Sequence, residues 1–383
     1  MPAYALVVQR IGRKIADLVI EVRFLAGAQG NKRHYRFVSN TIIEGYMDRP
    51  RKASNKRALW AVAILACAVS FVAGWVVEKN INVETPPVPL RLTGYQFISP
   101  LLSCNSSKLV PQDGAVSDAI EAVIKQHEST GDIDSAATYF ADFSTGQWSV
   151  VNPTDKYYPS SLGKVPILMA YLSMAENSST LLNQEVTFPL NSPNLNAQQE
   201  ITPEEAIVPG QTYTVSDLLG YMIKYSDNNA AQLLYNLANQ NTLESIYTDL
   251  QIPVDNNVTA ATLDFMTPEQ YSILFRTLYN STYLTRDDSE AALKLMTQTS
   301  FTQGLVAGVP SSTVVSHKFG IVSFSSGGVP TGRELHDCGI IYAPSHPYLL
   351  CVMTRSSSTL EASEQTISDI SAAVYNEVEN SGH

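Results

Sequence analysis

The sequence predicts an α+β fold, in which an antiparallel sheet is flanked by helices and joined to an all-helical second lobe. Residues 137–152 alternate apolar and polar side chains around a Ser-Thr-Gly turn, which is typical of a hairpin. Strand patterns return near the C-terminus at 314–323, 339–342 and 348–354. Helical patterns fill the interval, so both ends of the domain are expected to build one sheet. An uncharged 20-residue run, 58–77, further predicts one transmembrane helix ahead of this domain.

Charge is distributed unevenly on the two sides of the run 58–77. Residues 1–57 contain 12 Lys and Arg against 4 Asp and Glu, whereas residues 78–383 contain 13 against 32. Trp60 and Trp75 lie near the ends of the run, where interfacial aromatic residues are usual. By the positive-inside rule we predict a single-pass membrane protein with a cytoplasmic N-terminus and an extracytoplasmic C-terminal domain.

The chain is expected to have four parts. They are a basic cytoplasmic segment (1–57), a transmembrane helix (58–77), an extracytoplasmic stalk rich in Pro, Asn and Ser (78–112) and one folded domain (113–383). A helix over about 115–129 should open the domain, and one over 363–379 should end it. Because this domain is strongly acidic, we expect no nucleic-acid partner.

Four cysteines leave the disulfide pairing open. Cys67 lies in the apolar run, and Cys104, Cys338 and Cys351 follow it. Cys338 and Cys351 flank a predicted hairpin and could face each other, but free buried thiols are the commoner outcome.

Ser161 and Lys164 form a Ser-x-x-Lys pair just before an apolar helical run, 165–172. Residues three apart share a helix face, so this spacing puts an amine beside a hydroxyl. A serine needs a proton acceptor to attack at neutral pH, and a buried lysine with a lowered pKa can serve. Taken alone, the pattern also fits a helix start with a solvated lysine. Pro166 removes one helical hydrogen bond, so we expect an irregular first turn.

A second motif, Ser226-Asp-Asn228, follows a helix predicted over 214–225 with a capping box at Thr214 and Asp217. Asp and Asn at such a turn can simply bond to the local backbone. Standing after a Ser-x-x-Lys pair, however, Ser-Asp-Asn belongs to a known catalytic set. Ser226 would then relay a proton to a leaving nitrogen, and Asn228 would bind a substrate amide.

The third motif is Lys318-Phe-Gly320, at the beginning of a predicted strand. Lys318 would hold a substrate carboxylate, and Gly320 would let the substrate approach the backbone. The N–H groups of Ser161 and Ile321 are the expected oxyanion donors. The alternative for Lys318 is an ordinary solvated lysine on a strand.

In this order, the three motifs resemble those of the penicillin-recognising serine hydrolases, and the class A β-lactamases most closely. The resemblance runs from about residue 115 to the end and includes the segments 161–167, 208–214, 264–268 and 293–309. It implies a β-lactamase or D,D-peptidase-like fold, acylation of Ser161 with Lys164 as proton acceptor, and no metal or cofactor. The implied substrates are a β-lactam or a D-alanyl-D-alanine peptide.

Two positions depart from the family pattern. Phe319 replaces a threonine, which removes a hydroxyl from carboxylate recognition and adds an aromatic wall. The loop over about 251–263 lacks the glutamate that activates the deacylating water in class A enzymes, and Asp255 is its only acid. The alternatives are therefore a D,D-carboxypeptidase or penicillin-binding protein, and a slow-turnover sensor of cell-wall ligands or β-lactams. His336-Asp337 could suggest a triad, but a structural role is the better interpretation.

Overall fold

A computed structural model describes residues 64–66, 69–70, 90–103, 112–238, 240–252, 264–326 and 329–381. The predicted cytoplasmic segment, 1–57, lies outside the described residues. So does the predicted membrane run, 58–77, apart from 64–66 and 69–70, which are helical. Within the ranges described, no helix has both the length and the apolar character that crossing a membrane requires.

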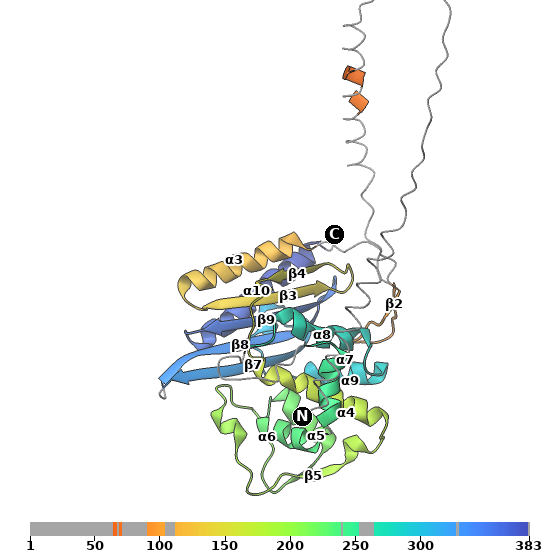
Figure 1. Cartoon of the computed structure of the whole chain (residues 1–383), viewed down its shortest axis with the longest axis vertical. Helices are drawn as coiled ribbons and strands as arrows, with labels where there is room; N and C mark the ends of the chain where they lie inside the picture. Colours follow the sequence, from red (N-terminus) through yellow and green to blue (C-terminus); the bar gives the residue numbers. More distant parts are fainter. Residues whose placement is uncertain are drawn as a thin grey trace, which may run out of the picture. The chain divides into compact units, whose positions relative to one another are not determined.

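Five antiparallel strands form the central sheet of the folded domain (Figure 1). They are β3 (Ser135–Asp142), β4 (Trp148–Val151), β7 (Val314–Ser326), β8 (Val329–Tyr342) and β9 (Pro347–Ser356). Their spatial order is β4-β3-β9-β8-β7, so β3 pairs with the last strand of the chain, and Ser135 lies opposite Arg355. The prediction that both ends of the domain build one sheet is confirmed.

Helices cover both faces of this sheet. One face carries α3 (Gly114–Thr130) and α10 (Leu360–Ser381), whose apolar side chains form a cluster with the sheet that includes Ile120 and Ile370. The other face carries α8 (Pro268–Asn280) and, beyond it, the helical lobe. Burial on both faces explains why β3 is buried along seven of its eight residues. The predicted first and last helices are confirmed, and each is a few residues longer than expected.

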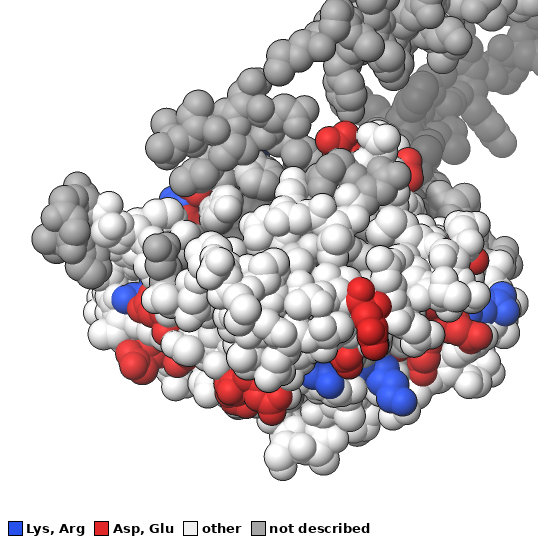
Figure 2. Space-filling view, turned by 90° about the horizontal axis from the view of Figure 1, so that it is seen from below, with Lys and Arg blue, Asp and Glu red and all other residues white. Residues whose placement is uncertain are grey.

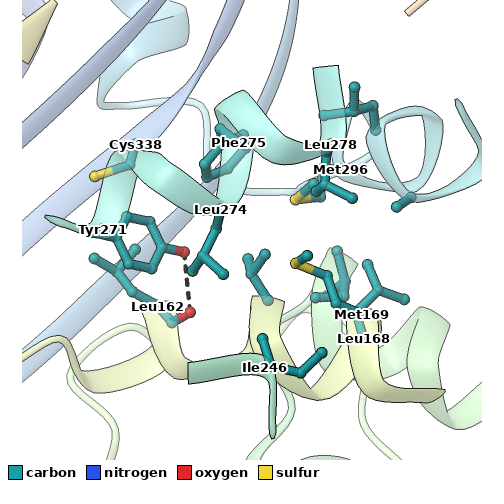
Figure 3. Close-up of a cluster of buried hydrophobic side chains, with 14 of the residues drawn as sticks. Leu162, Leu168, Met169, Ile246, Tyr271, Leu274, Phe275, Leu278, Met296 and Cys338 are labelled. Carbon is teal, nitrogen blue, oxygen red and sulfur yellow. Dashed lines mark hydrogen bonds between the residues drawn. The ribbon is translucent and has the colours of Figure 1, made fainter. Parts of the chain in front are cut away.

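The helical lobe is built around a second apolar cluster. Its other helices are α4 (Lys164–Glu176), α5 (Val215–Lys224), α6 (Asn228–Leu237), α7 (Gln240–Asp249) and α9 (Arg286–Met296), with a small sheet of β5 (Glu185–Thr187) and β6 (Thr212–Thr214). Side chains of α8, among them Tyr271 and Leu274, face Leu168 and Met169 of α4 (Figure 3). The Tyr271 hydroxyl donates to the Leu162 carbonyl at 3.0 Å, which ties α8 to the turn before α4.

Local chemistry sets the helix boundaries. Thr214 and Asp217 form the predicted capping box at the start of α5, each side chain bonded to the other's backbone N–H. Thr267 and Gln270 form a second one at α8, with Pro268 as its first residue. The two capping boxes determine where α5 and α8 begin.

Part of the range predicted as a stalk is packed on the folded domain. Two short strands pair there, β1 (Leu90–Arg91) and β2 (Leu101–Ser103). Phe97 and Ile98 are buried in the cluster of the helical lobe, and the Glu290 carboxylate accepts three hydrogen bonds from the N–H groups of 96–98, each 2.9 Å long. The folded body therefore begins before residue 113.

Cys338 of β8 and Cys351 of β9 lie directly opposite each other and form a disulfide bond. Both are completely buried. The expectation of free thiols is wrong, because the register of the β8–β9 hairpin brings the two residues face to face. Cys67 and Cys104 lie outside the described residues.

Charged residues are sparse on the face of the domain shown in Figure 2. Where the structure describes this face, Asp and Glu are scattered toward its margin, and the few Lys and Arg do not form a continuous patch. A surface of this kind repels a phosphate backbone more than it attracts one.

Candidate active site

The predicted nucleophile, Ser161, lies in a short 3-10 helix, η1 (Ser160–Gly163), and α4 begins at Lys164. In a 3-10 helix residues three apart are aligned, so the side chains of Ser161 and Lys164 leave the same side of the chain. Pro166 is the third residue of α4, where a backbone N–H has no partner within the helix, so proline is tolerated there. The turn that carries Ser161 is irregular, as expected, but the predicted cause is wrong, because Pro166 removes no hydrogen bond within α4.

The segment 159–163, which we call the nucleophile turn, is held against strand β7. The Ser160 hydroxyl donates to the Ile321 carbonyl at 2.5 Å, and Ser160 has a φ of 50°. A Cβ added at Gly320 would lie 2.8 Å from the Pro159 carbonyl oxygen and 3.1 Å from the Leu162 nitrogen. Gly320 therefore lets β7 approach the nucleophile turn. From the sequence we expected this glycine to let the substrate approach the backbone.

Replacing Gly320 with alanine is expected to lower the free energy of unfolding by about 1–3 kcal/mol, the usual cost of overpacking. The clash involves backbone atoms, so it is relieved only by moving the nucleophile turn, and acylation of Ser161 should slow as well. Urea unfolding would measure the loss of stability. Intact mass after incubation with a β-lactam would measure the rate of acylation. Gly220→Ala is the matched control, because its new Cβ would meet only the Lys224 side chain, 3.9 Å away. Equal stability of both variants would contradict the prediction.

Ser226 is the point where the predicted motifs meet. It is almost completely buried, and its hydroxyl accepts hydrogen bonds from Lys164 Nζ and Lys318 Nζ, both 3.0 Å long. Lys164 Nζ also donates to the Ser226 carbonyl at 2.6 Å and to Asn228 Oδ1 at 2.7 Å. Four of the seven predicted site residues are thus joined by hydrogen bonds.

Burial makes both lysines weaker bases than usual. It lowers the pKa of Lys164 to about 7, although the nearby Asp227 carboxylate acts in the opposite direction. Burial, helped by the charge of Lys164, also lowers the pKa of Lys318 well below its usual range, against the effect of Asp337. At neutral pH a substantial fraction of Lys164 is therefore an uncharged amine, the form that can accept a proton.

Asp227, between Ser226 and Asn228, holds the backbone around the motif. Its carboxylate accepts hydrogen bonds from the N–H groups of Asn229 and Ala230 at the start of α6. The backbone interpretation of the Ser-Asp-Asn stretch therefore holds for Asp227, and the catalytic interpretation of Ser226 and Asn228 stays a prediction. The aspartate performs the local turn chemistry, while the flanking residues face the lysines.

Lys318 and Phe319 differ from what the sequence suggested. Lys318 is completely buried, and its Nζ contacts Ser226, the Phe319 carbonyl at 2.8 Å and the Phe319 ring, whose centroid is 4.0 Å away. The Phe319 ring stacks on Phe301, with 4.5 Å between centroids, and is only 2% exposed. The expectation of an aromatic wall facing the ligand is wrong, because the ring is part of the core.

His336 and Asp337 have separate structural roles. Asp337 pairs with buried His317 at 2.8 Å and accepts from the Leu305 N–H at 3.0 Å. His336 Nε2 lies 3.0 Å from the Tyr158 carbonyl. Because neighbouring strand residues point to opposite faces, the two side chains do not act together, and the structural interpretation is supported.

A buried ion cluster, which the sequence analysis missed, supports the approach to the nucleophile turn. Glu334 is completely buried and accepts from the Tyr158 N–H and from Arg355 Nε, both at 2.9 Å. The Arg355 guanidinium also contacts Asp264, next to the loop that lacks a glutamate. Glu334 lies before the strand predicted over 339–342, so no local pattern marked it as buried. Asp255 and the loop residues 253–263 lie outside the described residues.

No cluster of three or more His, Cys, Asp or Glu side chains suited to a metal ion occurs in the described part of the chain. The acyl chemistry that the lysines and serines allow uses proton transfer between side chains.

Comparison with known proteins gives consistent matches. The family model described as "Beta-lactamase enzyme family" matches residues 115–378. Among curated proteins, β-lactamase VEB-1 of Pseudomonas aeruginosa is 24% identical over 245 residues, covering 58% of this chain and 78% of that protein.

Solved structures show the same fold at low sequence identity. A β-lactamase from Sphaerobacter thermophilus gives a TM-score of 0.57 at 18% identity, over 69% of this chain and 98% of that one. PBP-A gives a TM-score of 0.56 at 18% identity, over 71% of this chain and the whole of that one. The predicted β-lactamase-like α+β fold is confirmed.

Proposed function

The chain belongs to the β-lactamase enzyme family and is a serine hydrolase, and on this premise we propose that it opens β-lactam amides by acylation of Ser161. The observation that carries the proposal is the convergence of Lys164 and Lys318 on the Ser226 hydroxyl, next to the nucleophile turn. A hydroxyl that is hydrogen-bonded to two buried amines can accept and donate protons during a reaction.

In the proposed reaction Ser161 Oγ attacks the amide carbon while its proton passes to uncharged Lys164. The N–H groups of Ser161 and Ile321 bind the oxyanion. Ser226 then gives its proton to the leaving nitrogen and regains one from Lys164, so a C–O bond forms, the C–N bond breaks and the proton count balances. Lys318 keeps the Ser226 hydroxyl oriented and favours a carboxylate on the leaving side, and Asn228 binds the amide on the acyl side.

Deacylation is expected to be slow. Residues 251–263 contain no glutamate to activate water. Asp227 caps α6, and Glu334 binds Arg355 and the Tyr158 N–H, so both carboxylates already have other partners. This favours a second candidate, a penicillin-binding protein or D,D-carboxypeptidase acting on D-alanyl-D-alanine. Among similar structures, a PBP-A variant forms an acyl-enzyme complex with penicillin G.

We also propose that residues 58–77 anchor the enzyme as a single-pass protein, with 1–57 in the cytoplasm and the catalytic domain outside. The uncharged run and the basic residues before it support this arrangement. In this setting a long-lived acyl-enzyme could report cell-wall ligands through the cytoplasmic segment, which is the sensor alternative.

The deciding experiment follows the full-length chain in detergent with a chromogenic cephalosporin, by absorbance over many turnovers and by intact mass, beside Ser161→Ala. We expect a mass adduct on the wild type, slow turnover and neither signal in the variant. Rapid, sustained hydrolysis would establish an efficient β-lactamase. An adduct with no more than one turnover would favour the penicillin-binding candidate. Absence of both signals from the wild type would refute acyl-serine chemistry.

A further inference from the structure

Tyr158, three residues before Ser161, is held by two side chains of β8. Its backbone N–H donates to Glu334 Oε2 at 2.9 Å, and its carbonyl oxygen lies 3.0 Å from His336 Nε2. Because a carbonyl oxygen can only accept, Nε2 carries the hydrogen and donates it. The side chains of Glu334 and His336 are completely buried. We call these two hydrogen bonds the clamp.

Backbone contacts hold the chain on either side of Tyr158. Tyr157 exchanges two hydrogen bonds with Met266, which are 3.0 and 3.3 Å long. The Pro159 carbonyl accepts from the Leu162 N–H at 3.0 Å, which closes the nucleophile turn on itself. The peptide groups of Tyr158 lie between these contacts and are bonded to side chains instead. The clamp therefore connects β8 directly to the chain that enters the nucleophile turn.

The same part of β8 also holds the second expected oxyanion donor. Leu335 lies directly opposite Ile321 of β7, and Glu334 and His336 are its two neighbours. β8 lies between β7 and β9 in the sheet, so its own position is fixed on both edges (Figure 1). Under the proposed function, the N–H groups of Ser161 and Ile321 bind the oxyanion. One strand thus holds both donor segments, the first through the clamp and the second through its pairing with β7.

The ring of His336 makes one hydrogen bond with two nitrogen atoms. Its Nδ1 is buried and has no hydrogen-bond partner in the part of the chain that the structure describes. Leaving a buried polar atom without a partner costs stability. An apolar side chain could pack against the Tyr157 ring, whose centroid is 5.5 Å from that of His336, without this cost. The contribution that is specific to histidine here is therefore the Nε2 donor.

We propose that His336 and Glu334 are positioning residues for acylation, which act by fixing the Ser161 N–H relative to the Ile321 N–H through the clamp. This inference rests on the proposed acylation of Ser161. It goes beyond a structural role, because it predicts a slower reaction in protein that remains folded.

The expected effect is smaller than the loss of a donor. Removing an oxyanion donor outright slows a reaction by about 10²–10³-fold, and a misplacement of about 1 Å can cost about 10²-fold. Without the His336 bond the Ser161 N–H is still present but less well placed, so acylation should slow by about 10–100-fold. The change should appear in the rate at saturating ligand and not in the half-saturating concentration, because the oxyanion forms only in the transition state.

The test measures acylation of the full-length protein by penicillin G, using intact mass at several ligand concentrations. His336→Gln places an amide nitrogen where Nε2 lies and keeps a donor for the Tyr158 carbonyl. The amide of His336→Asn is too short to reach that carbonyl. We expect the saturating rate to fall about 10–100-fold in His336→Asn and less than about threefold in His336→Gln, with similar half-saturating concentrations. Rescue by glutamine would identify the Nε2 donor as the group that acts.

Two further variants separate positioning from stability. His127 is also buried, and it pairs with Asp132 and Asp369 on the opposite face of the sheet. His127→Asn is the matched control, which should lose stability and keep the wild-type saturating rate. His336→Met, as long as glutamine but without a donor, should be as slow as His336→Asn and repeats the test if that variant does not fold. Urea unfolding would establish that each variant is folded under the assay conditions.

The outcomes distinguish the positioning role from the proposed function. Equal rates in His336→Gln and His336→Asn, or a wild-type rate in His336→Met, would overturn the positioning role and leave acylation of Ser161 intact. So would a change confined to the half-saturating concentration, or an equally slow His127→Asn. No adduct on the wild type would refute the proposed function and the positioning role with it.

Discussion

Replacing Lys164 with methionine is expected to slow acylation of Ser161 by about 10²–10⁴-fold, the usual contribution of a positioned general base. Methionine fills a similar volume in this buried position, so the loss reflects the missing proton acceptor rather than a cavity. The measurement is the second-order rate constant for adduct formation with a β-lactam, followed by intact mass. Lys156→Met, an exposed change a few residues before the nucleophile turn, should leave the rate unchanged.

The pH dependence of the same reaction distinguishes a base from a structural residue. Burial lowers the pKa of Lys164 to about 7, so the wild-type rate should rise as pH increases through 7 and level off once the amine has lost its proton. Well below pH 7 the rate should fall about tenfold per pH unit, because only the neutral amine accepts a proton. Lys164→Met should lose this dependence. A variant that kept the wild-type profile would assign the base to another group.

Replacing Arg355 with methionine is expected to lower the free energy of unfolding by about 3–5 kcal/mol, the usual cost of leaving a buried charge without its partner. Glu334 is completely buried and would keep only its hydrogen bond from the Tyr158 N–H and the more distant His336. Urea unfolding at neutral pH measures the change. Adding Glu334→Gln to this variant removes the stranded charge and should recover part of the loss. A double variant less stable than Arg355→Met would contradict this explanation.

Acid should weaken the wild type through the same cluster. Burial alone would raise the pKa of Glu334, but interactions with His336, the Tyr158 N–H and Arg355 outweigh it, so the pKa lies below the ordinary value of 4.5. A carboxylate with a lowered pKa contributes stability above the unfolded-state value and loses it as pH falls through the folded-state value. The variant that lacks both Arg355 and Glu334 should therefore lose stability less steeply below pH 4.5.

The parts of the fold that the sequence predicted correctly depend on short-range chemistry. The capping box at Thr214 and Asp217, and the hairpin around 144–146, involve residues a few positions apart, so their patterns can be read directly. The meeting of Lys164, Ser226 and Lys318 was also predicted, but through a family resemblance, since these residues are distant in sequence.

The features that were missed depend on tertiary register. Whether Cys338 meets Cys351 is decided by which residues of β8 and β9 face each other, and a shift of one residue would separate them. Phe319 was assigned to the ligand side because its neighbours carry the motif, but Phe301 draws its ring into the core. Glu200 contacts Ser323 and Arg333, which lie more than a hundred residues away in the sequence, so no local pattern indicates the contact.

The pairing of β3 with β9 determines when this domain can fold during its synthesis. Asp142 ends β3, and its neighbour strand begins at Pro347, about two hundred residues later. At about 5–20 residues per second, the ribosome needs roughly ten to forty seconds to supply the missing partner. During that interval β3, which is buried on both faces in the folded domain, has no neighbour on one edge and is open to wrong pairing. A nascent chain that stops before β9 should therefore depend on chaperones or aggregate, even though it already carries every residue assigned to catalysis.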